Sequence, residues 1–208
     1  VAPSGESTID VPRERAIVAV GHIVTMLLNL CELDINRRQI CETSPQLLNG
    51  VANVIGIDFM PSDAGGDQMQ IDSMRLFGHL ALSAPVAGND HPSWSHGYAM
   101  LVKVLAERAK RSEAALTAAI NALKALISVY PDIASDAPSL LKVVGPLAVI
   151  ATAQDLKLAG LQLLVQMMSS HELVEKAFGG ERGMDSLEEF TQQLVADLER
   201  LRSRMNPS

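Results

Sequence analysis

A series of long, nearly all-apolar predicted helices constrains this chain more than any other feature of its sequence. Each of these helices has one narrow polar stripe, whose residues return at steps of three and four, the period of an α-helix. A helix of this kind must pack on most of its sides. The pattern covers residues 13–33, 67–83, 112–129 and 153–170. We therefore expect the chain to fold by stacking these helices against one another.

The long helices recur in register. The leucines that occupy the same place in each of them are Leu30, Leu80, Leu126 and Leu164. Their spacing averages about 45 residues, which is typical of helical solenoid repeats. Shorter predicted helices and breaks rich in Pro, Gly and Asp separate the long helices. One repeat of this kind cannot bury its apolar side alone, so the units stack and share a continuous core.

The recurrence predicts an all-α domain of about four units. This domain is expected to span residues 13–208, after a disordered or linker N-terminus at residues 1–12. Because the first residue is Val1 rather than Met, we expect the chain to be a fragment of a longer protein. Residues 184–205, MDSLEEFTQQLVADLERLRSRM, predict a final helix with a charged outer side. Such a helix is expected to cap the stack, because end repeats need a polar outer side.

The composition favours a helical protein and argues against two classes of partner, nucleic acids and membranes. Hydrophobic residues make up 48% of the chain and aromatic residues only 3%, which favours helix over strand. The net charge of −7 argues against general binding to a phosphate backbone, so we expect no direct nucleic-acid binding. No uninterrupted apolar run reaches about 18 residues, so no membrane span is expected.

The chain has two cysteines, Cys31 and Cys41. They are too few for a disulfide framework and lack the spacing of metal ligands. Both have apolar neighbours, so we expect buried, reduced thiols. Reduced thiols indicate a reducing compartment, and the expected location is therefore cytoplasmic or nuclear.

One stretch resembles the junction between two armadillo repeats. Residues 26–55 read MLLNLCELDINRRQICETSPQLLNGVANVI. In the armadillo family, a third helix that ends in Leu-x-Asn-Leu is followed by Asn-(Lys/Arg)-x-x-Ile, a turn and a Leu-rich helix. The residues that match this pattern are Leu27, Asn29, Leu30, Asn36, Arg37, Ile40, Leu47, Leu48 and Val51.

The resemblance implies a right-handed α-solenoid of armadillo- or HEAT-like repeats. In that family the third helices line a concave groove, and the Asn of the motif, here Asn29, holds the backbone of an extended partner peptide. Later units depart from the pattern, with His79, Ala125 and Gln162 or Leu163 where the Asn falls. Thr25 stands where importin-like members have Trp. Nuclear-import cargo binding is therefore not expected.

The polar stripes of the stacked long helices are expected to lie side by side and form a groove for a partner. Amide side chains suit this role because they both donate to and accept from a peptide backbone. The alternative is that the stripes are ordinary solvated faces. The candidate groove residues are Thr25, Asn29, Arg75, His79, Asn121, Lys124, Gln162 and Gln166.

We therefore predict a non-enzymatic protein-interaction module that binds a peptide or helix of a partner protein. The alternative function is a structural core subunit of a large multiprotein complex, such as a chromatin-remodelling assembly. The sequence contains no nucleophile elbow, P-loop, GxGxxG or HExxH motif, so neither enzymatic activity nor a cofactor is expected.

A predicted loop at residues 84–97 is the one place where ligand-type residues gather. Asp90, His91 and His96 could in principle meet a metal ion, but their spacing fits no strong motif, and no metal site is expected. Trp94, in this loop, and Tyr98, just after it, are expected either to tuck under the loop or to contact a partner protein, since Trp and Tyr are favoured at interfaces.

Overall fold

The computed structural model describes residues 11–60, 63–83, 92–134 and 137–170, with the isolated residues Val174, Glu175, Gln192 and Ala196. Over these residues the secondary structure is helical, with eight α-helices and no strand. The prediction of an all-α fold is confirmed. None of the described helices is long and apolar enough to cross a bilayer.

The order of the helices along the chain is as follows. In chain order they are α1 (Val11–Leu30), α2 (Asp34–Thr43), α3 (Pro45–Ile55), α4 (Gly66–Leu82), α5 (Pro92–Ala106), α6 (Glu113–Val129), α7 (Ala137–Ile150) and α8 (Gln154–Ser169). Two single 3-10 turns, Arg108–Lys110 and Pro131–Ile133, lie before α6 and α7. The four long stretches expected from the polar stripes correspond to α1, α4, α6 and α8.

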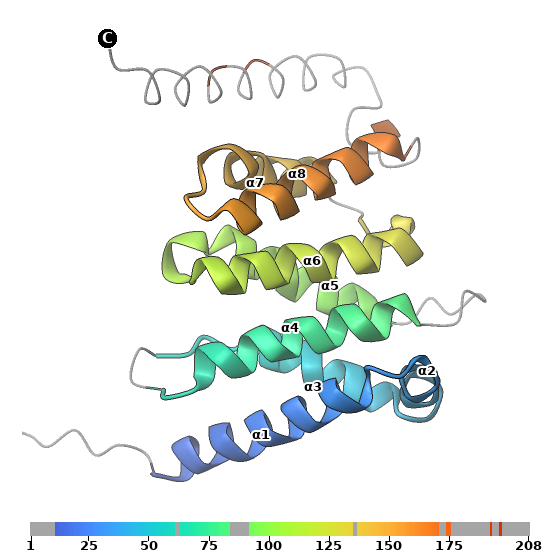
Figure 1. Cartoon of the computed structure of the whole chain (residues 1–208), viewed down its shortest axis with the longest axis vertical. Helices are drawn as coiled ribbons and strands as arrows, with labels where there is room; N and C mark the ends of the chain where they lie inside the picture. Colours follow the sequence, from blue (N-terminus) through green and yellow to red (C-terminus); the bar gives the residue numbers. More distant parts are fainter. Residues whose placement is uncertain are drawn as a thin grey trace, which may run out of the picture.

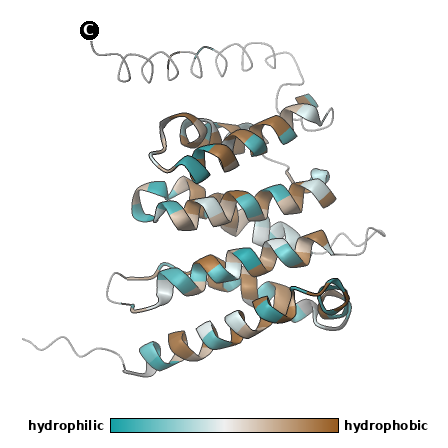
Figure 2. Cartoon of the chain, viewed as in Figure 1, coloured by the Kyte–Doolittle hydropathy of each residue, from teal (hydrophilic) through white to brown (hydrophobic). Residues whose placement is uncertain are grey.

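The helices form two layers. Helices α1, α4, α6 and α8 lie side by side in that order, and each contacts the next (Figure 1). We call these four the front layer. Helices α3, α5 and α7 lie behind it, and each packs on its neighbours in both layers. The expectation that the four long helices stack against one another is confirmed. Hydrophilic and hydrophobic residues are both found along each helix of the front layer (Figure 2).

Close backbone contact sets the spacing within and between the layers. A Cβ atom on Gly78 of α4 would lie 3.1 Å from the Cα atom of Ala122 in α6. A Cβ atom on Gly160 of α8 would lie 3.1 Å from the Cα atom of Ala148 in α7. Real Cβ contacts are seldom this short, so each glycine lets two helices approach more closely than any other residue permits.

The aromatic residues of α5 belong to the core. Trp94 and Tyr98 are buried, and the Trp94 ring packs edge-to-face on Phe77 of α4 with the ring centroids 5.1 Å apart. The predicted loop is therefore wrong for residues 92–97, because α5 begins at Pro92. Proline suits the first position of a helix, where its missing N–H has no partner to lose.

A buried arginine ties the α3–α4 connection to the region before α6. The side chain of Arg111 is only 7% exposed and pairs with Asp58 at 2.7 Å and with Glu107 at 2.9 Å. Arg111 also donates to Oε1 of Gln70, whose amide nitrogen donates to the carbonyl oxygen of Ile55 at 2.6 Å. Charged and amide groups thus help to hold the connection in place.

Two predictions concern the ends of the chain. Residues 1–10 of the expected N-terminal linker lie outside the described residues, and α1 begins at Val11. The predicted final helix at residues 184–205 also lies outside them, apart from Gln192 and Ala196. Both stay predictions.

Candidate functional site

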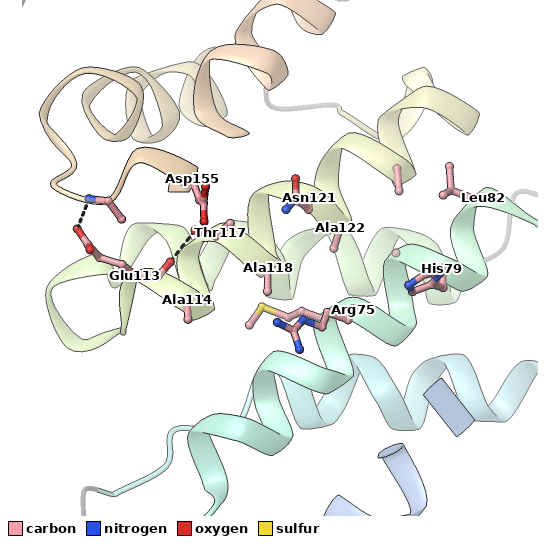
Figure 3. Close-up of a pocket in the computed structure, with 14 residues that line it drawn as sticks. Arg75, His79, Leu82, Glu113, Ala114, Thr117, Ala118, Asn121, Ala122 and Asp155 are labelled. Atoms are coloured by element: carbon pink, nitrogen blue, oxygen red, sulfur yellow. Dashed lines mark hydrogen bonds between the residues drawn. The ribbon is translucent and has the colours of Figure 1, made fainter. Parts of the chain in front are cut away.

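A groove of about 630 Å³ opens on the front layer between α4, α6 and the start of α8 (Figure 3). We call it the α4–α6 groove. The residues that line it come from these three helices and the residue before α8, and are Met74, Arg75, Gly78, His79, Leu82, Glu113, Ala114, Thr117, Ala118, Asn121, Ala122, Ala125, Ala153 and Asp155.

Small residues make up much of the groove lining. Gly78, Ala118 and Ala122 are buried where α4 and α6 approach one another. Ala114 and Ala125 continue the same side of α6 in both directions. Because these side chains are short, they leave a hollow between the longer side chains that project from the two helices. The lining is therefore apolar over much of its length and shaped to accept small apolar groups.

Longer polar side chains border this apolar lining. Arg75 and His79 project from α4 and Asn121 from α6 (Figure 3), and all three are exposed. Arg75 pairs with Asp72 at 3.2 Å. Oδ1 of Asn121 accepts a long hydrogen bond, 3.5 Å, from Nζ of Lys124. The His79 imidazole and the Asn121 amide can each donate and accept hydrogen bonds, as a peptide backbone requires.

The Glu113 carboxylate links the start of α6 to the residues before α8, at one end of the groove. It accepts hydrogen bonds from the backbone N–H groups of Thr152 at 3.1 Å and Ala153 at 3.2 Å, and from the Thr152 hydroxyl. The hydrogen bond from this hydroxyl, and then that from the Ala153 N–H, keeps the pKa of Glu113 below its ordinary value. These contacts fix the start of α8 against the start of α6, where Asp155 adds a second carboxylate.

Three of the predicted groove residues line the α4–α6 groove, namely Arg75, His79 and Asn121. Three more lie between α6 and α8. Nζ of Lys124 donates to Oε1 of Gln162, and the Gln166 amide donates to the Lys124 carbonyl oxygen at 3.0 Å. We call Lys124, Gln162 and Gln166 the α6–α8 bridge.

The remaining predicted residues lie elsewhere. Thr25 and Asn29 are exposed on α1, and neither lines the groove. The Thr25 hydroxyl donates to the carbonyl oxygen of Gly21 at 3.0 Å. Trp94 and Tyr98, the possible partner contacts, are buried in α5 instead. Their burial commits most of both side chains to the core.

Sequence reasoning missed several residues that line the groove. Thr117 and Asp155 belong to the polar stripes of their helices but were not selected, and Glu113 stands just after the expected helix start. The alanines could have been found from their spacing, because Ala114, Ala118, Ala122 and Ala125 recur at steps of four, four and three. A line of alanines on one side of a helix indicates close helix contact or a hollow surface.

The groups considered for a metal site do not come together in the described part of the chain. His96 forms a 2.9 Å hydrogen bond between a ring nitrogen and Oδ1 of Asn53, which links α5 to α3. Asp90 and His91 lie outside the described residues. Among the residues described, no three His, Cys, Asp or Glu side chains are grouped to hold a metal ion.

The two thiols are free, with Cys31 buried and Cys41 partly buried. Burial raises the pKa of Cys41 to about 11, and burial also raises the pKa of Cys31. At neutral pH both are therefore protonated thiols, which are poor nucleophiles.

No family model, curated protein or solved structure matches the chain. Function is therefore inferred from the groove and the helices that form it.

Proposed function

We propose that this chain is a non-enzymatic protein-interaction module that binds a peptide or helix of a partner protein along the α4–α6 groove. In this proposal the two layers are part of a right-handed, armadillo- or HEAT-like α-solenoid. The observation that carries the proposal is that Arg75, His79 and Asn121, selected from their stripe positions, line one groove with an apolar lining.

The chemistry of the groove supports recognition of a peptide. Alanines and a glycine offer space for small apolar side chains, while Asn121 and His79 offer donors and acceptors for backbone amides. Charges of both signs border it, with Arg75 on α4, Glu113 at the start of α6 and Asp155 at the start of α8. Among the lining residues, the Glu113 carboxylate is committed to its capping hydrogen bonds, and the Thr117 hydroxyl donates to the Glu113 carbonyl oxygen at 2.8 Å. Such a surface favours binding over catalysis.

The proposal is tested by selecting peptides that bind the chain from a displayed random library. The affinity of each selected peptide is then compared between the chain and Asn121→Ala by fluorescence anisotropy. A buried or well-packed polar contact at an interface contributes enough that its loss weakens binding by about tenfold. We expect a loss of about that size for Asn121→Ala, and a similar loss for His79→Ala.

The matched control is Asn49→Ala. Asn49 is an exposed asparagine of α3, in the other layer, so its substitution should leave peptide affinity unchanged. If the two asparagine variants bind the selected peptides equally well, the groove is not the binding site. A library that yields no binding peptide contradicts the proposal as well.

A second candidate function is that of a structural subunit in a larger protein complex. Exposed large apolar side chains on α1, α2 and the turn between them support it, since contiguous patches of this kind mark protein contacts. They are Val18, Ile23, Met26, Leu30, Leu33 and Ile35. If these residues are covered in a complex, the isolated chain should self-associate, and Met26→Glu with Leu30→Glu should reduce this. A monodisperse chain at high concentration would count against this candidate.

A further inference from the structure

The outer side of α8 carries a stripe of exposed apolar residues. They follow one another at steps of three, four and three, and each is between 43% and 64% exposed. We call Leu158, Leu161, Val165 and Met168 the α8 end stripe. The opposite side of α8 is buried against α6 and α7 through residues such as Leu156 and Leu163. The stripe therefore lies on the side of α8 that the described helices leave uncovered.

The position of α8 explains why this side is open. Helices α4 and α6 each have a neighbour on both sides within the front layer (Figure 1). Among the described helices, α8 has a neighbour in that layer only at α6. A stacked helix with an open apolar side needs a further element to cover it, as the end units of repeat arrays do.

The sequence after α8 contains a segment with a matching pattern. In residues 184–205 the large apolar residues recur at steps of three, four, four, three and four, which places them on one side of a predicted helix. These residues are Leu187, Phe190, Leu194, Leu198, Leu201 and Met205. Two residues of the segment are described: Gln192 and Ala196 are helical, they fall on the opposite, polar side, and Gln192 is exposed.

Charges along the segment also suit a helix. Glu188 and Glu189 stand near its start, and Arg200, Arg202 and Arg204 stand near its end. Acidic residues at the N-terminus and basic residues at the C-terminus complement the helix dipole.

We propose that residues 184–205 form a helix whose apolar side packs on the α8 end stripe. The stripe runs from Leu158 to Met168, a rise of about 15 Å along α8, so it offers a contact of about that length. The connecting residues 171–183 include the helical residues Val174 and Glu175. They span between about 20 Å if wholly helical and about 40 Å if extended, which is enough to bring the segment back to α8. The site is an end surface of the stack and is separate from the α4–α6 groove.

A segment of the same chain is favoured over a second molecule as the occupant. A tethered segment reaches its surface at an effective concentration on the order of millimolar. A separate copy at micromolar concentration competes poorly with it. The α8 end stripe should therefore be covered within one molecule.

The test is amide hydrogen exchange of the full chain followed by mass spectrometry, combined with light scattering. In the unchanged chain, a monomer with protected amides between residues 187 and 201 is expected. Val165→Glu places a charge in the stripe at a side chain that is 64% exposed, so the described helices tolerate it. It should reduce protection of residues 187–201 by about tenfold or more and leave α4 and α6 unchanged. Leu198→Glu, which places a charge on the apolar side of the segment itself, should reduce the same protection.

The matched control is Met60→Glu, which introduces the same charge at a 60% exposed apolar residue between α3 and α4, away from α8. It should leave the protection of residues 187–201 unchanged. If Val165→Glu has no more effect on this protection than the control, the segment does not dock on α8. A dimer that Val165→Glu converts to a monomer, with no change in protection at 187–201, would assign the stripe to a second copy and overturn the proposal.

Discussion

Gly97 shows how tightly the centre of the molecule is packed. A Cβ atom at this position would overlap the ring of Phe77, and that ring also packs against Trp94. The chain therefore has a glycine in the middle of α5, where glycine costs helix stability, because no side chain fits between α5 and Phe77.

We predict that Gly97→Ala destabilises the protein by about 1–3 kcal/mol, the usual cost of overpacking a well-filled core. Gly50 of α3 is the matched control, since nothing lies within 4 Å of a Cβ atom built there. Gly50→Ala should stabilise by up to about 1 kcal/mol through helix propensity alone. Urea denaturation of both variants measures the difference. Equal stabilities would show that the Phe77 ring moves aside.

The Glu113 carboxylate should make stability depend on pH. Hydrogen bonds from Thr152 and Ala153 hold its pKa below the ordinary value. A carboxyl group whose pKa is lowered by folding stabilises the folded state above its unfolded-state pKa. This stabilisation is lost as the pH falls through its folded-state pKa.

We therefore expect Glu113→Gln to lower the thermal midpoint at neutral pH, because the neutral amide accepts the same hydrogen bonds more weakly. The difference from the unchanged chain should shrink as the pH falls through the lowered folded-state pKa of Glu113, because the carboxyl is then protonated as well. Glu42→Gln, at an exposed residue of α2, is the control. A midpoint difference for Glu113→Gln that stays constant with pH would contradict this account.

The junction of α1, α2 and α4 depends on side chains that cap a helix end. The guanidinium group of Arg37 donates to the Cys31 carbonyl oxygen and to the Ser83 hydroxyl, both at 2.7 Å. The Asn36 amide donates to the Leu30 carbonyl oxygen at 2.9 Å. The last carbonyls of a helix have no partner within the helix, so these two residues of the Asn-Arg motif satisfy the end of α1.

We predict that Arg37→Ala destabilises the protein by about 2 kcal/mol, the scale of a lost hydrogen bond from a charged group. Arg38 is the matched control, because its side chain is 66% exposed and its ion pair with Asp34 lies at the surface. Arg38→Ala should change stability by no more than about 0.5 kcal/mol. The two unfolding free energies are compared in urea. Similar losses would mean that the capping bonds of Arg37 contribute little.

The long helices could be predicted from the sequence because their polar stripes are narrow and regular. The start of α5 could not, since Pro92, Ser95, His96 and Gly97 are typical of a loop when read alone. They form a helix because Trp94, Tyr98, Leu101 and Leu105 recur at steps of four, three and four and are buried together. Tertiary burial here outweighs local loop preference.

The groove was predictable only in part. Stripe positions identified Arg75, His79 and Asn121, because they follow directly from helical period. The hollow itself depends on how closely α4 approaches α6 at Gly78 and Ala122, and no periodicity encodes that distance. Helical period also cannot tell which stripes share one groove. Thr25 and Asn29 of α1 were therefore predicted to line a groove with residues of α4, α6 and α8, from which they are separate.

The layered arrangement predicts how the molecule opens. Within the front layer, each helix packs on the helices next to it. Stability is therefore expected to vary along the stack, as in other repeat-like folds. Buried residues are dense in α4 and α6, whereas few residues of α1 are buried.

We expect the amides of α1 to exchange with solvent much faster than those of α4 and α6, by about tenfold or more. Hydrogen exchange measured peptide by peptide tests this. The substitution Leu123→Ala, in the centre of α6 where the side chain is fully buried, should cost about 2–5 kcal/mol and accelerate exchange in both α4 and α6. Uniform exchange along the chain would indicate one cooperative unit instead.

The contact between α4 and α6 and the contact between α6 and α8 differ in how easily the angle between the two helices can change. At Gly78 and Ala122 backbone touches backbone, and no side chain there can rotate to absorb a change in angle. Across the α6–α8 bridge the contact runs through the long side chains of Lys124, Gln162 and Gln166, which can swing to new rotamers. Bending under load would therefore concentrate between α6 and α8, giving the molecule one stiff section and one compliant section.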